Sequence, residues 1–371
     1  MKTPVVVGLA SILILARMRA LGHVFRRVLL ARSSADPSGY GENHAVVEAL
    51  LDKAKVSGWT RAATVDGGVQ SRSNQRVLAN ALEEHGADLI HITSQNDAHM
   101  VPKKGAAAPA VVSVHDLYDH RPRAIDAGDV PVPLGDRFPP SAKARLLASC
   151  REGMARADLL LCASERTLEE AREMFPDTRC VLVRDSVDDE FWDPNRNPRP
   201  RRMLGESGDE DRCLLVSVGE KDPRWRAQFV NEVFSLIPEE VRGDLLLFRI
   251  GAGRIDWEQV AAAFQHAEAV LYPGVSVGFR SPPLEAMASG CPVLASDLLM
   301  HDEVLPPRCL LPATDSDHWV SAIVEIHSKW VRAGGIPRHV DDELLSLAKG
   351  SFGRSAHGGV LSDAYDIACA K

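Results

Sequence analysis

The residues with the clearest chemical potential lie between two apolar runs in the second half of the chain. Residues 272–297 read Tyr-Pro-Gly-Val-Ser-Val-Gly-Phe-Arg-Ser-Pro-Pro-Leu-Glu-Ala-Met-Ala-Ser-Gly-Cys-Pro-Val-Leu-Ala-Ser-Asp. This pattern predicts a strand, a glycine-containing loop, a helix of about eight residues from Pro282 to the stop at Gly290, and a second strand. The loop and the amino end of the helix offer N–H groups to a phosphate. Glu285, in the first helical turn, can accept hydrogen bonds from ribose hydroxyls.

A second group of polar side chains, His115-Asp-Leu-Tyr-Asp-His120, directly follows the apolar run Ala110–Val114. Open α/β sheets place their ligands at the carboxyl ends of strands, which favours a site role for His115. Two imidazoles and two carboxylates also have the chemistry of a divalent-metal site, and a plain loop histidine is the third interpretation.

Two other motifs point to different chemistries but fit them less well. Gly274-Val-Ser-Val-Gly278 matches the nucleophile elbow of α/β-hydrolases, yet that elbow passes directly from serine into a helix, whereas Phe279 to Pro282 follow here. A serine hydrolase that uses Ser276 is therefore the less favoured alternative. Asp315-Ser-Asp317 precedes a helical run, which favours helix capping over metal binding.

Apolar runs rich in β-forming residues alternate with longer helical stretches, a pattern typical of α/β proteins with parallel sheets. The apolar residues run on without alternation, as expected where helices cover both faces of a sheet. The stretch from Phe191 to Asp211, rich in proline and charge, predicts a linker between two such domains. The predicted strands are Val5–Val7, Val24–Leu30, Ala62–Val65, Asp88–Ile92, Ala110–Val114, Leu159–Cys162, Cys180–Val183, Cys213–Val218, Asp244–Ile250, Ala269–Tyr272, Pro292–Ala295 and Cys309–Leu311.

Size and composition agree with two globular domains. The chain has 371 residues, and about 150 residues is typical of one domain. Its 45% hydrophobic and 25% charged residues are ordinary for a soluble protein. A net charge of −8 argues against nucleic-acid binding through the overall field. The seven widely spaced cysteines, without a CxxC pair, predict reduced thiols and a cytoplasmic protein.

The amino-terminal segment is locally basic, because six cations precede the first acidic residue, Asp36. Solvated ends of helices and strands are the simpler interpretation. Contact with anionic lipid, as a protein peripheral to the inner membrane face, is the alternative. The six residues are Lys2, Arg17, Arg19, Arg26, Arg27 and Arg32.

The segment around Glu285 resembles the retaining nucleotide-sugar glycosyltransferases of the GT-B fold, specifically glycosyltransferase family 4. Their pattern is approximately Glu-Gly-Phe-Gly-Leu-Pro-x-Leu-Glu-Ala-Met-Ala-x-Gly-x-Pro-Val-x-Ala-Ser. This chain matches it at Gly278, Phe279, Pro282, Leu284 to Ala288, Gly290, Pro292, Val293, Ala295 and Ser296. Weaker similarities extend the resemblance to Val112–Leu117, Ala155–Ser164, Val187–Pro194, Ser351–Phe352 and Ala364–Tyr365.

The resemblance implies a GT-B-like α/β fold with two Rossmann-like parallel-sheet domains that face a central cleft. Residues 1–190 would form the acceptor domain, 191–211 the linker, 212–348 the donor-nucleotide domain, and 349–371 a helix that crosses back to the first domain. The implied enzyme is a hexosyltransferase that moves a sugar from a nucleotide-diphosphate sugar to an acceptor hydroxyl with retention. No residue is assigned to a metal, and no cofactor is expected, because the nucleotide sugar is a co-substrate.

The resemblance also assigns roles to single residues. Glu285 would hold the nucleotide ribose, and His115 would lie near the transferred sugar and the acceptor, as the predicted catalytic residue. The predicted donor-binding residues are Glu285, Gly278, Phe279, Arg280, Ser281, Leu284, Lys221, Arg224 and Arg226. The three cations Lys221, Arg224 and Arg226 have the charge that a leaving diphosphate requires.

Two of the departures from the family pattern bear on activity. Val277 replaces the first glutamate of the motif, and Trp225 stands where a lysine is usual. These departures leave open a second interpretation, in which a protein of the GT-B fold has lost catalysis and acts as a binding or partner subunit.

Overall fold

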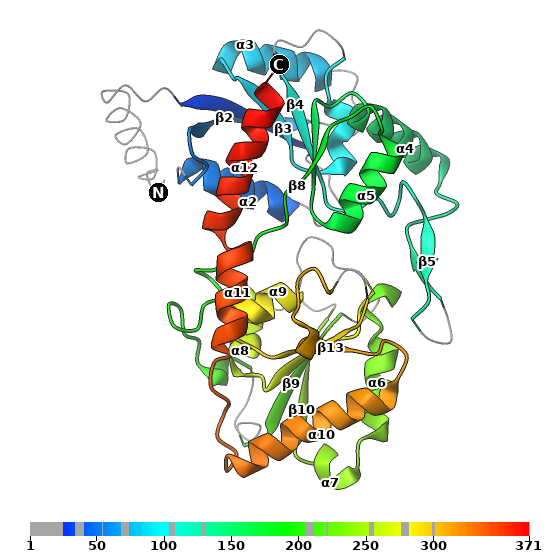
Figure 1. The fold of residues 1–371 in the computed structure, drawn as a ribbon, viewed down its shortest axis with the longest axis vertical. Helices are drawn as coiled ribbons and strands as arrows, with labels where there is room; N and C mark the ends of the chain where they lie inside the picture. The colour runs from blue at the N-terminus through cyan, green and yellow to red at the C-terminus, as the bar shows by residue number, and fades with distance from the viewer. Residues whose placement is uncertain are drawn as a thin grey trace, which may run out of the picture. The chain divides into compact units, whose positions relative to one another are not determined.

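The computed structural model describes residues 25–33, 41–53, 55–67, 74–103, 108–127, 131–204, 211–219, 222–251, 256–275, 282–298 and 301–370. They form two compact units, which are considered separately (Figure 1). The first unit comprises Met1–His120, Phe138–Asp185 and Arg354–Lys371, and the second comprises Arg121–Arg137 and Ser186–Gly353. The segment Arg121–Arg137 therefore groups with the second unit, although the sequence-based boundaries kept it inside residues 1–190.

The first unit is built on a parallel sheet. Of its described residues, six strands pair in the order β2-β1-β3-β4-β7-β8. The strands are β1 (Arg26–Ser33), β2 (Trp59–Gly67), β3 (Leu89–Ile92), β4 (Ala110–Val114), β7 (Leu159–Cys162) and β8 (Cys180–Leu182). The helices are α2 (Gly41–Asp52), α3 (Asn74–His85), the 3₁₀ helix η1 (Gln95–Met100), α4 (Ser141–Met154), α5 (Glu165–Met174) and α12 (Arg354–Cys369).

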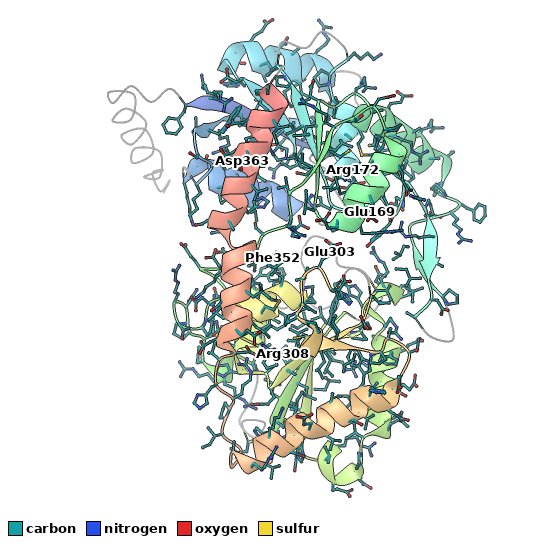
Figure 2. All side chains as sticks on the ribbon, viewed as in Figure 1. Glu169, Arg172, Glu303, Arg308, Phe352 and Asp363 are labelled. Carbon is teal, nitrogen blue, oxygen red and sulfur yellow. The ribbon has the colours of Figure 1, made fainter. Side chains whose placement is uncertain are left out.

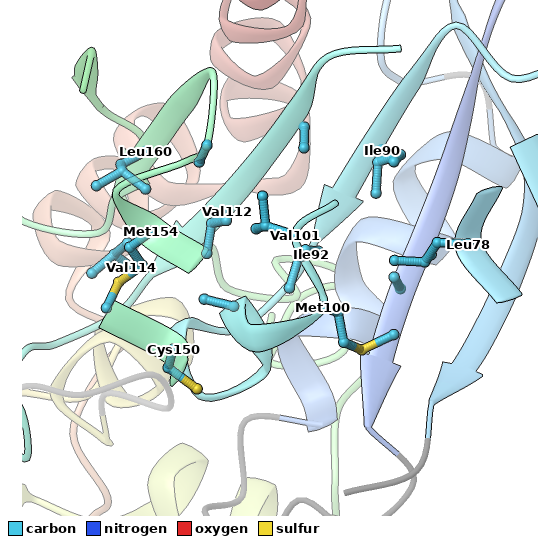
Figure 3. Packing of buried hydrophobic residues seen from close by; sticks show 14 of the residues in the cluster. Leu78, Ile90, Ile92, Met100, Val101, Val112, Val114, Cys150, Met154 and Leu160 are labelled. Carbon is cyan, nitrogen blue, oxygen red and sulfur yellow. The ribbon is translucent and has the colours of Figure 1, made fainter. Parts of the chain in front are cut away.

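Both faces of this sheet are buried, which explains the unbroken apolar runs of its strands. Within β1, Leu29 packs into the cluster on one face and Leu30 into the cluster on the other. Figure 3 shows the first of these clusters, where Ile92 and Val112 of the sheet lie near Met100 of η1.

The last helix, α12, packs on the first unit through buried polar contacts as well as apolar ones. Tyr365 is fully buried, and its hydroxyl lies 2.7 Å from His91 Nδ1. The indole of Trp59 donates to Asp366 Oδ1 at 3.0 Å, and Ser362 donates to the carbonyl of Ser57 at 2.8 Å. These contacts anchor the carboxyl-terminal segment to residues far earlier in the chain.

The second unit repeats the same architecture. Of its described residues, five parallel strands pair in the order β10-β9-β11-β12-β13. The strands are β9 (Cys213–Val218), β10 (Leu245–Ile250), β11 (Ala269–Tyr272), β12 (Val293–Ser296) and β13 (Leu310–Leu311). The helices are η2 (Arg201–Leu204), η3 (Pro223–Trp225), α6 (Ala227–Leu236), α7 (Glu239–Arg242), α8 (Trp257–His266), α9 (Pro282–Ala288), η4 (Pro307–Cys309), α10 (Ser316–Arg332) and α11 (Asp342–Phe352).

Helices also cover both faces of the second sheet (Figure 1). Trp319 of α10 and Phe229 of α6 pack with Leu215 on one face, and residues of α8, α9 and α11 fill the other. The predicted α/β class with two Rossmann-like parallel sheets is therefore confirmed. Asp315 caps α10 by accepting from the N–H groups of Asp317 and His318 at 3.1 and 3.2 Å, which confirms the predicted capping role.

The sequence did not predict the antiparallel hairpin of β5 (Arg123–Ile125) and β6 (Val132–Leu134). Each strand has three residues and neither contains an unbroken apolar run. The hairpin belongs to the second unit, where β6 packs against η3.

Candidate functional site

The order of strands in the second sheet reverses between β9 and β11. In open α/β sheets, ligands bind beyond the carboxyl ends of the strands at such a reversal. The loop after β9 contains Arg224 and Arg226, and the segment after β11 contains Pro273 to Val275. The two loops are joined, because the N–H of Val275 donates to the carbonyl of Arg224 at 2.9 Å.

The guanidinium of Arg226 bridges the ends of several segments. Nη1 donates to the carbonyl of Pro273 at 3.1 Å and to Ser296 Oγ at 3.3 Å, and Nη2 donates to the carbonyl of Ala127 in the hairpin. These acceptors are neutral. Burial lowers the pKa of Arg226 below its ordinary value, but an arginine of this kind stays charged. The site therefore holds a half-buried positive charge at the reversal of the strand order.

Arg226 also has a rare backbone conformation. Its φ is +53°, and it is the one residue other than glycine with a positive φ in the described part of the chain. It precedes the first turn of α6, and its guanidinium lies 4.3 Å from the ring centre of Phe229. Residues in this region of conformational space are often found at functional sites, where the surrounding structure maintains them.

The neighbouring residues of this loop are also firmly placed. Asp222 caps η3 and accepts from the N–H of Arg224 at 2.9 Å, while the Arg224 guanidinium forms an ion pair with the same carboxylate at 2.5 Å. Burial opposes ionisation of Asp222, but these bonds to Arg224 lower the pKa of its carboxyl. Trp225 packs edge-on against Tyr272 at 5.7 Å between ring centres and covers Gly219, whose missing side chain makes room for the indole.

Helix α9 begins at Pro282, as predicted, and Gly290 follows it with φ +59°. Glu285 lies in the first turn and is half-buried, whereas Leu284 is 5% exposed and packs in the core of the second unit. A donor-binding role for these two residues stays a prediction.

Arg338 holds the carboxyl end of α9 in place, and the sequence analysis missed it. Its guanidinium donates to the carbonyls of Gly290 and Ala267 at 2.6 Å each, and to that of Phe264 at 3.2 Å. Nearby, Arg308, labelled in Figure 2, forms a two-pronged ion pair with Asp341 at 3.0 Å. A lone arginine in a loop carries no pattern from which such carbonyl contacts could be predicted.

His301 is a second residue that the sequence analysis missed. Its ring is fully buried, Nδ1 donates to the carbonyl of Ser296 at 2.6 Å, and the ring lies edge-on to Tyr272. Burial lowers the pKa of His301, so the ring is neutral. His301 thus contacts the backbone of Ser296, whose side chain accepts from Arg226.

In the first unit, His115 follows β4, as predicted, and is 3% exposed. Nδ1 donates to Asp185 Oδ1 at 3.1 Å, and Nε2 donates to the carbonyl of Thr93 at 3.1 Å. Burial opposes protonation of the ring, but the Asp185 carboxylate and these two hydrogen bonds raise the pKa of His115. Both ring nitrogens of His115 are thus hydrogen-bonded, and the raised pKa favours the protonated ring. Its catalytic role stays a prediction.

His120 is also buried, but in a different electrostatic setting. Neither ring nitrogen has a hydrogen-bond partner among the described residues. Burial, reinforced by the nearby Arg151, lowers the pKa of His120 to about 4. Among the described residues, no group of three or more His, Cys, Asp or Glu side chains is placed to hold a metal ion.

Several predicted residues lie outside the described part of the chain. Among the donor-binding predictions these are Lys221, Gly278, Phe279, Arg280 and Ser281, and the same holds for Ser276, Val277 and the predicted strand Val5–Val7.

Two of the amino-terminal cations are engaged within the first unit. Arg26 pairs with Asp366 and lies over the Trp59 ring, and Arg32 pairs with Asp66 at 2.6 Å. Within the residues that the structure describes, none of the helices combines the length and the apolar character needed to span a bilayer. Peripheral membrane contact stays a prediction.

Part of the chain is similar to a known protein family. Residues 211–329, which include β9 to β13 and both arginines, match the family model of glycosyl transferases group 1. A 73-residue segment is 37% identical to the O-antigen chain mannosyltransferase RfbU of Salmonella typhimurium, and it covers 19% of this chain and 21% of that protein. The sequence match thus spans about a fifth of that relative.

Solved structures match over nearly the whole chain. Sucrose-phosphate synthase from Thermosynechococcus elongatus superposes with a TM-score of 0.63 at 16% identity, over 92% of this chain and 98% of that one. Anabaena HepE in complex with UDP gives 0.61 at 12% identity, over 91% and 99%. The catalytic domain of Arabidopsis starch synthase IV, bound to ADP and acarbose, gives 0.61 at 10% identity, over 94% and 100%. At these identities the likeness shows a shared fold.

Proposed function

We propose that this protein, whose residues 211–329 match the family model of glycosyl transferases group 1, moves a sugar from a nucleotide-diphosphate sugar to an acceptor hydroxyl. The proposal includes retention at the anomeric carbon and transfer of a hexose. It requires no cofactor beyond the nucleotide sugar itself.

The observation that carries the proposal is the position of Arg226. This cation lies at the reversal of strand order in the family-matching unit, and its hydrogen-bond partners among the described residues are neutral oxygens. A diphosphate bound at this place would lie beside a guanidinium that is bonded to no carboxylate among the described residues, so its positive charge would be available to the phosphate oxygens. HepE has been solved with UDP and with UDP-glucose, which supports a donor of the same chemical class here.

The chemistry follows from charge and position rather than from a nucleophile. When the bond between the sugar and the diphosphate breaks, its electron pair stays on the leaving phosphate oxygen while the acceptor oxygen bonds to the anomeric carbon and gives up its proton. Cations held in advance beside the leaving oxygen therefore lower the barrier. Arg226 would supply that charge, and Glu285 would hold the ribose from the first turn of α9. His115, as an imidazolium, would contribute a positive charge near the acceptor. A ring that is already protonated would not act as a base. Orientation of donor and acceptor supplies the remaining acceleration.

The ribose assignment is tested with Glu285→Ala, with Glu239→Ala on the exposed side of α7 as the matched control. Binding of UDP-, GDP- and ADP-sugars is measured by calorimetry, and sugar release is measured with and without acceptors. We expect Glu285→Ala to weaken donor binding at least tenfold, about the effect of a lost hydrogen bond to a charged group. Unchanged binding and turnover in Glu285→Ala would refute the assignment.

A specific observation keeps the degenerate binding subunit as a second candidate. Trp225, which stands in place of the family's lysine, fills the space above Gly219 with an apolar ring. The same calorimetry separates the two candidates: tight donor binding without turnover for any acceptor tested would favour the binding subunit.

A further inference from the structure

The hairpin of β5 and β6 contacts the proposed donor site through the backbone of Ala127 and through the packing of β6 on η3. The carbonyl of Ala127, in the turn between the two strands, accepts a hydrogen bond from Nη2 of Arg226. Ala127 is 2% exposed, and β6 packs against η3, directly before Arg226 in the chain. A segment far away in sequence thus contributes to the surroundings of this arginine.

The pattern of hydrogen bonds decides which edge of the guanidinium is left for a ligand. A guanidinium has five N–H groups in a fixed plane. Nη1 donates to the carbonyl of Pro273 and to Ser296 Oγ, and Nη2 donates to the carbonyl of Ala127. With respect to the described residues, the Nε–H group and the second N–H of Nη2 remain. The Nε–H group and the N–H of Nη2 on the same side form one edge of the guanidinium plane, and such an edge can bind two phosphate oxygens at once.

We propose that the hairpin is a positioning element for the donor phosphate. The carbonyl of Ala127 fixes the rotation of the Arg226 guanidinium, so that its Nε and Nη2 edge is presented to a diphosphate. This inference rests on the proposed function, because it assigns Arg226 a two-pronged contact with the leaving group.

Three further features favour this orientation of the guanidinium. The positive φ of Arg226 sets the direction in which its side chain leaves the backbone. The ring of Phe229 lies against one face of the guanidinium plane. Ser296 Oγ itself donates to the carbonyl of Pro273 at 2.9 Å, which joins the two Nη1 acceptors to each other. The other contacts do not bond to Nη2 of Arg226. Loss of the Ala127 carbonyl would therefore allow the guanidinium to rotate.

The test compares three changes by calorimetry with UDP, GDP and ADP, and with the corresponding nucleosides. Arg226→Lys keeps the charge but removes the two-pronged edge. A hairpin variant replaces residues 123–134 by a short Gly-Ser link, and Ala127→Gly loosens the carbonyl with the least change to the fold. Arg242→Lys on α7 and Ala333→Gly after α10 are the matched controls in the same unit.

We expect Arg226→Lys and the hairpin variant each to weaken binding of the nucleoside diphosphate about tenfold or more, while affinity for the nucleoside stays the same. Ala127→Gly should show a smaller loss in the same direction. The two large effects should not add in the double variant, because both act through one contact. Equal loss for nucleoside and diphosphate, additive effects, or unchanged diphosphate affinity in a folded hairpin variant would overturn the proposal.

A second readout separates this inference from the proposed function. The coupling between Ala127→Gly and Arg226→Lys is also measured in the protein without ligand, as the non-additivity of their shifts in denaturant midpoint. If no nucleotide binds the natural protein, the proposed function fails while this coupling still tests the hairpin contact. Additive midpoint shifts would show that the hairpin does not hold Arg226.

Discussion

The imidazole of His115 and the carboxylate of Asp185 lie 3.1 Å apart at the end of the first-unit sheet. Because the other ring nitrogen lies 3.1 Å from the carbonyl of Thr93, both nitrogens act as donors, and the ring is held as an imidazolium. Burial alone would lower the pKa of His115. The pKa is raised because the Asp185 carboxylate and the Thr93 carbonyl stabilise the protonated ring.

Asp185→Asn should therefore lower the pKa of His115 and destabilise the fold by roughly 1–3 kcal/mol at pH 5.5. Since the pKa of His115 is raised in the folded state, the stabilisation is fully present below the ordinary value of 6.5 and is lost as pH rises through the folded value. The difference between the variant and the natural protein should accordingly shrink at pH 9. NMR titration of the ring and thermal unfolding at both pH values measure this, with the exposed Asp177→Asn as control. A pKa of His115 that is unchanged in Asp185→Asn would contradict the ion pair.

His120 predicts the opposite dependence on pH. Burial and the nearby Arg151 lower its pKa to about 4, so the unfolded chain takes up a proton that the folded one refuses. This group removes stability as pH falls from about 6.5 toward 4, by roughly 3 kcal/mol in total. His120→Leu should lose that part of the acid sensitivity, whereas the exposed His339→Leu should keep it. Urea unfolding at pH 7 and pH 4.5 provides the comparison, and parallel acid profiles for all three proteins would count against a buried neutral His120.

The sequence predicted those strands and helices that are marked by residues within the element or at its ends. The apolar runs Ala110–Val114 and Cys213–Val218 became β4 and β9, because strands buried on both faces need apolar residues throughout. Helix α9 was predicted because Pro282 and Gly290 mark its ends. The β5 and β6 hairpin was not, since three-residue strands depend on packing against η3, which lies much later in the chain.

The candidate site was predictable in its charges but not in its contacts. The residue types identified Arg226 as a cation near the site, and composition cannot show that it bonds to neutral oxygens of three separate segments. His301 and Arg338 carried no motif at all, because their partners are backbone carbonyls, which every residue possesses. Such contacts follow from the tertiary fold alone.

Close packing of α4 on η1 gives a prediction about Gly153. A methyl group at this position would lie 1.8 Å from the carbonyl oxygen of Ala98, so Gly153→Ala must push the two helices apart. We expect a loss of roughly 1–3 kcal/mol in unfolding free energy. Gly359→Ala in α12 is the matched change, because nothing lies within 4 Å of its added methyl. It should stabilise the fold by about 0.5–1 kcal/mol, since alanine loses less entropy in a helix. Shifts of the same sign in chemical denaturation would show that the α4 contact is looser than described.

The left-handed backbone of Arg226 allows its conformational cost to be separated from its side-chain contacts. Arg226→Ala and Arg226→Gly both remove the guanidinium, but only glycine adopts a φ of +53° without a steric cost. Arg226→Gly should therefore be more stable than Arg226→Ala by about 1 kcal/mol. At the exposed Gln228, inside α6, the order should reverse by a similar amount of about 1 kcal/mol, because alanine favours a helix and glycine does not. Denaturant unfolding of the four variants gives both differences. If alanine proved the more stable at both positions, the positive φ of Arg226 would be wrong, and with it the direction in which the side chain leaves the loop toward Pro273 and Ser296.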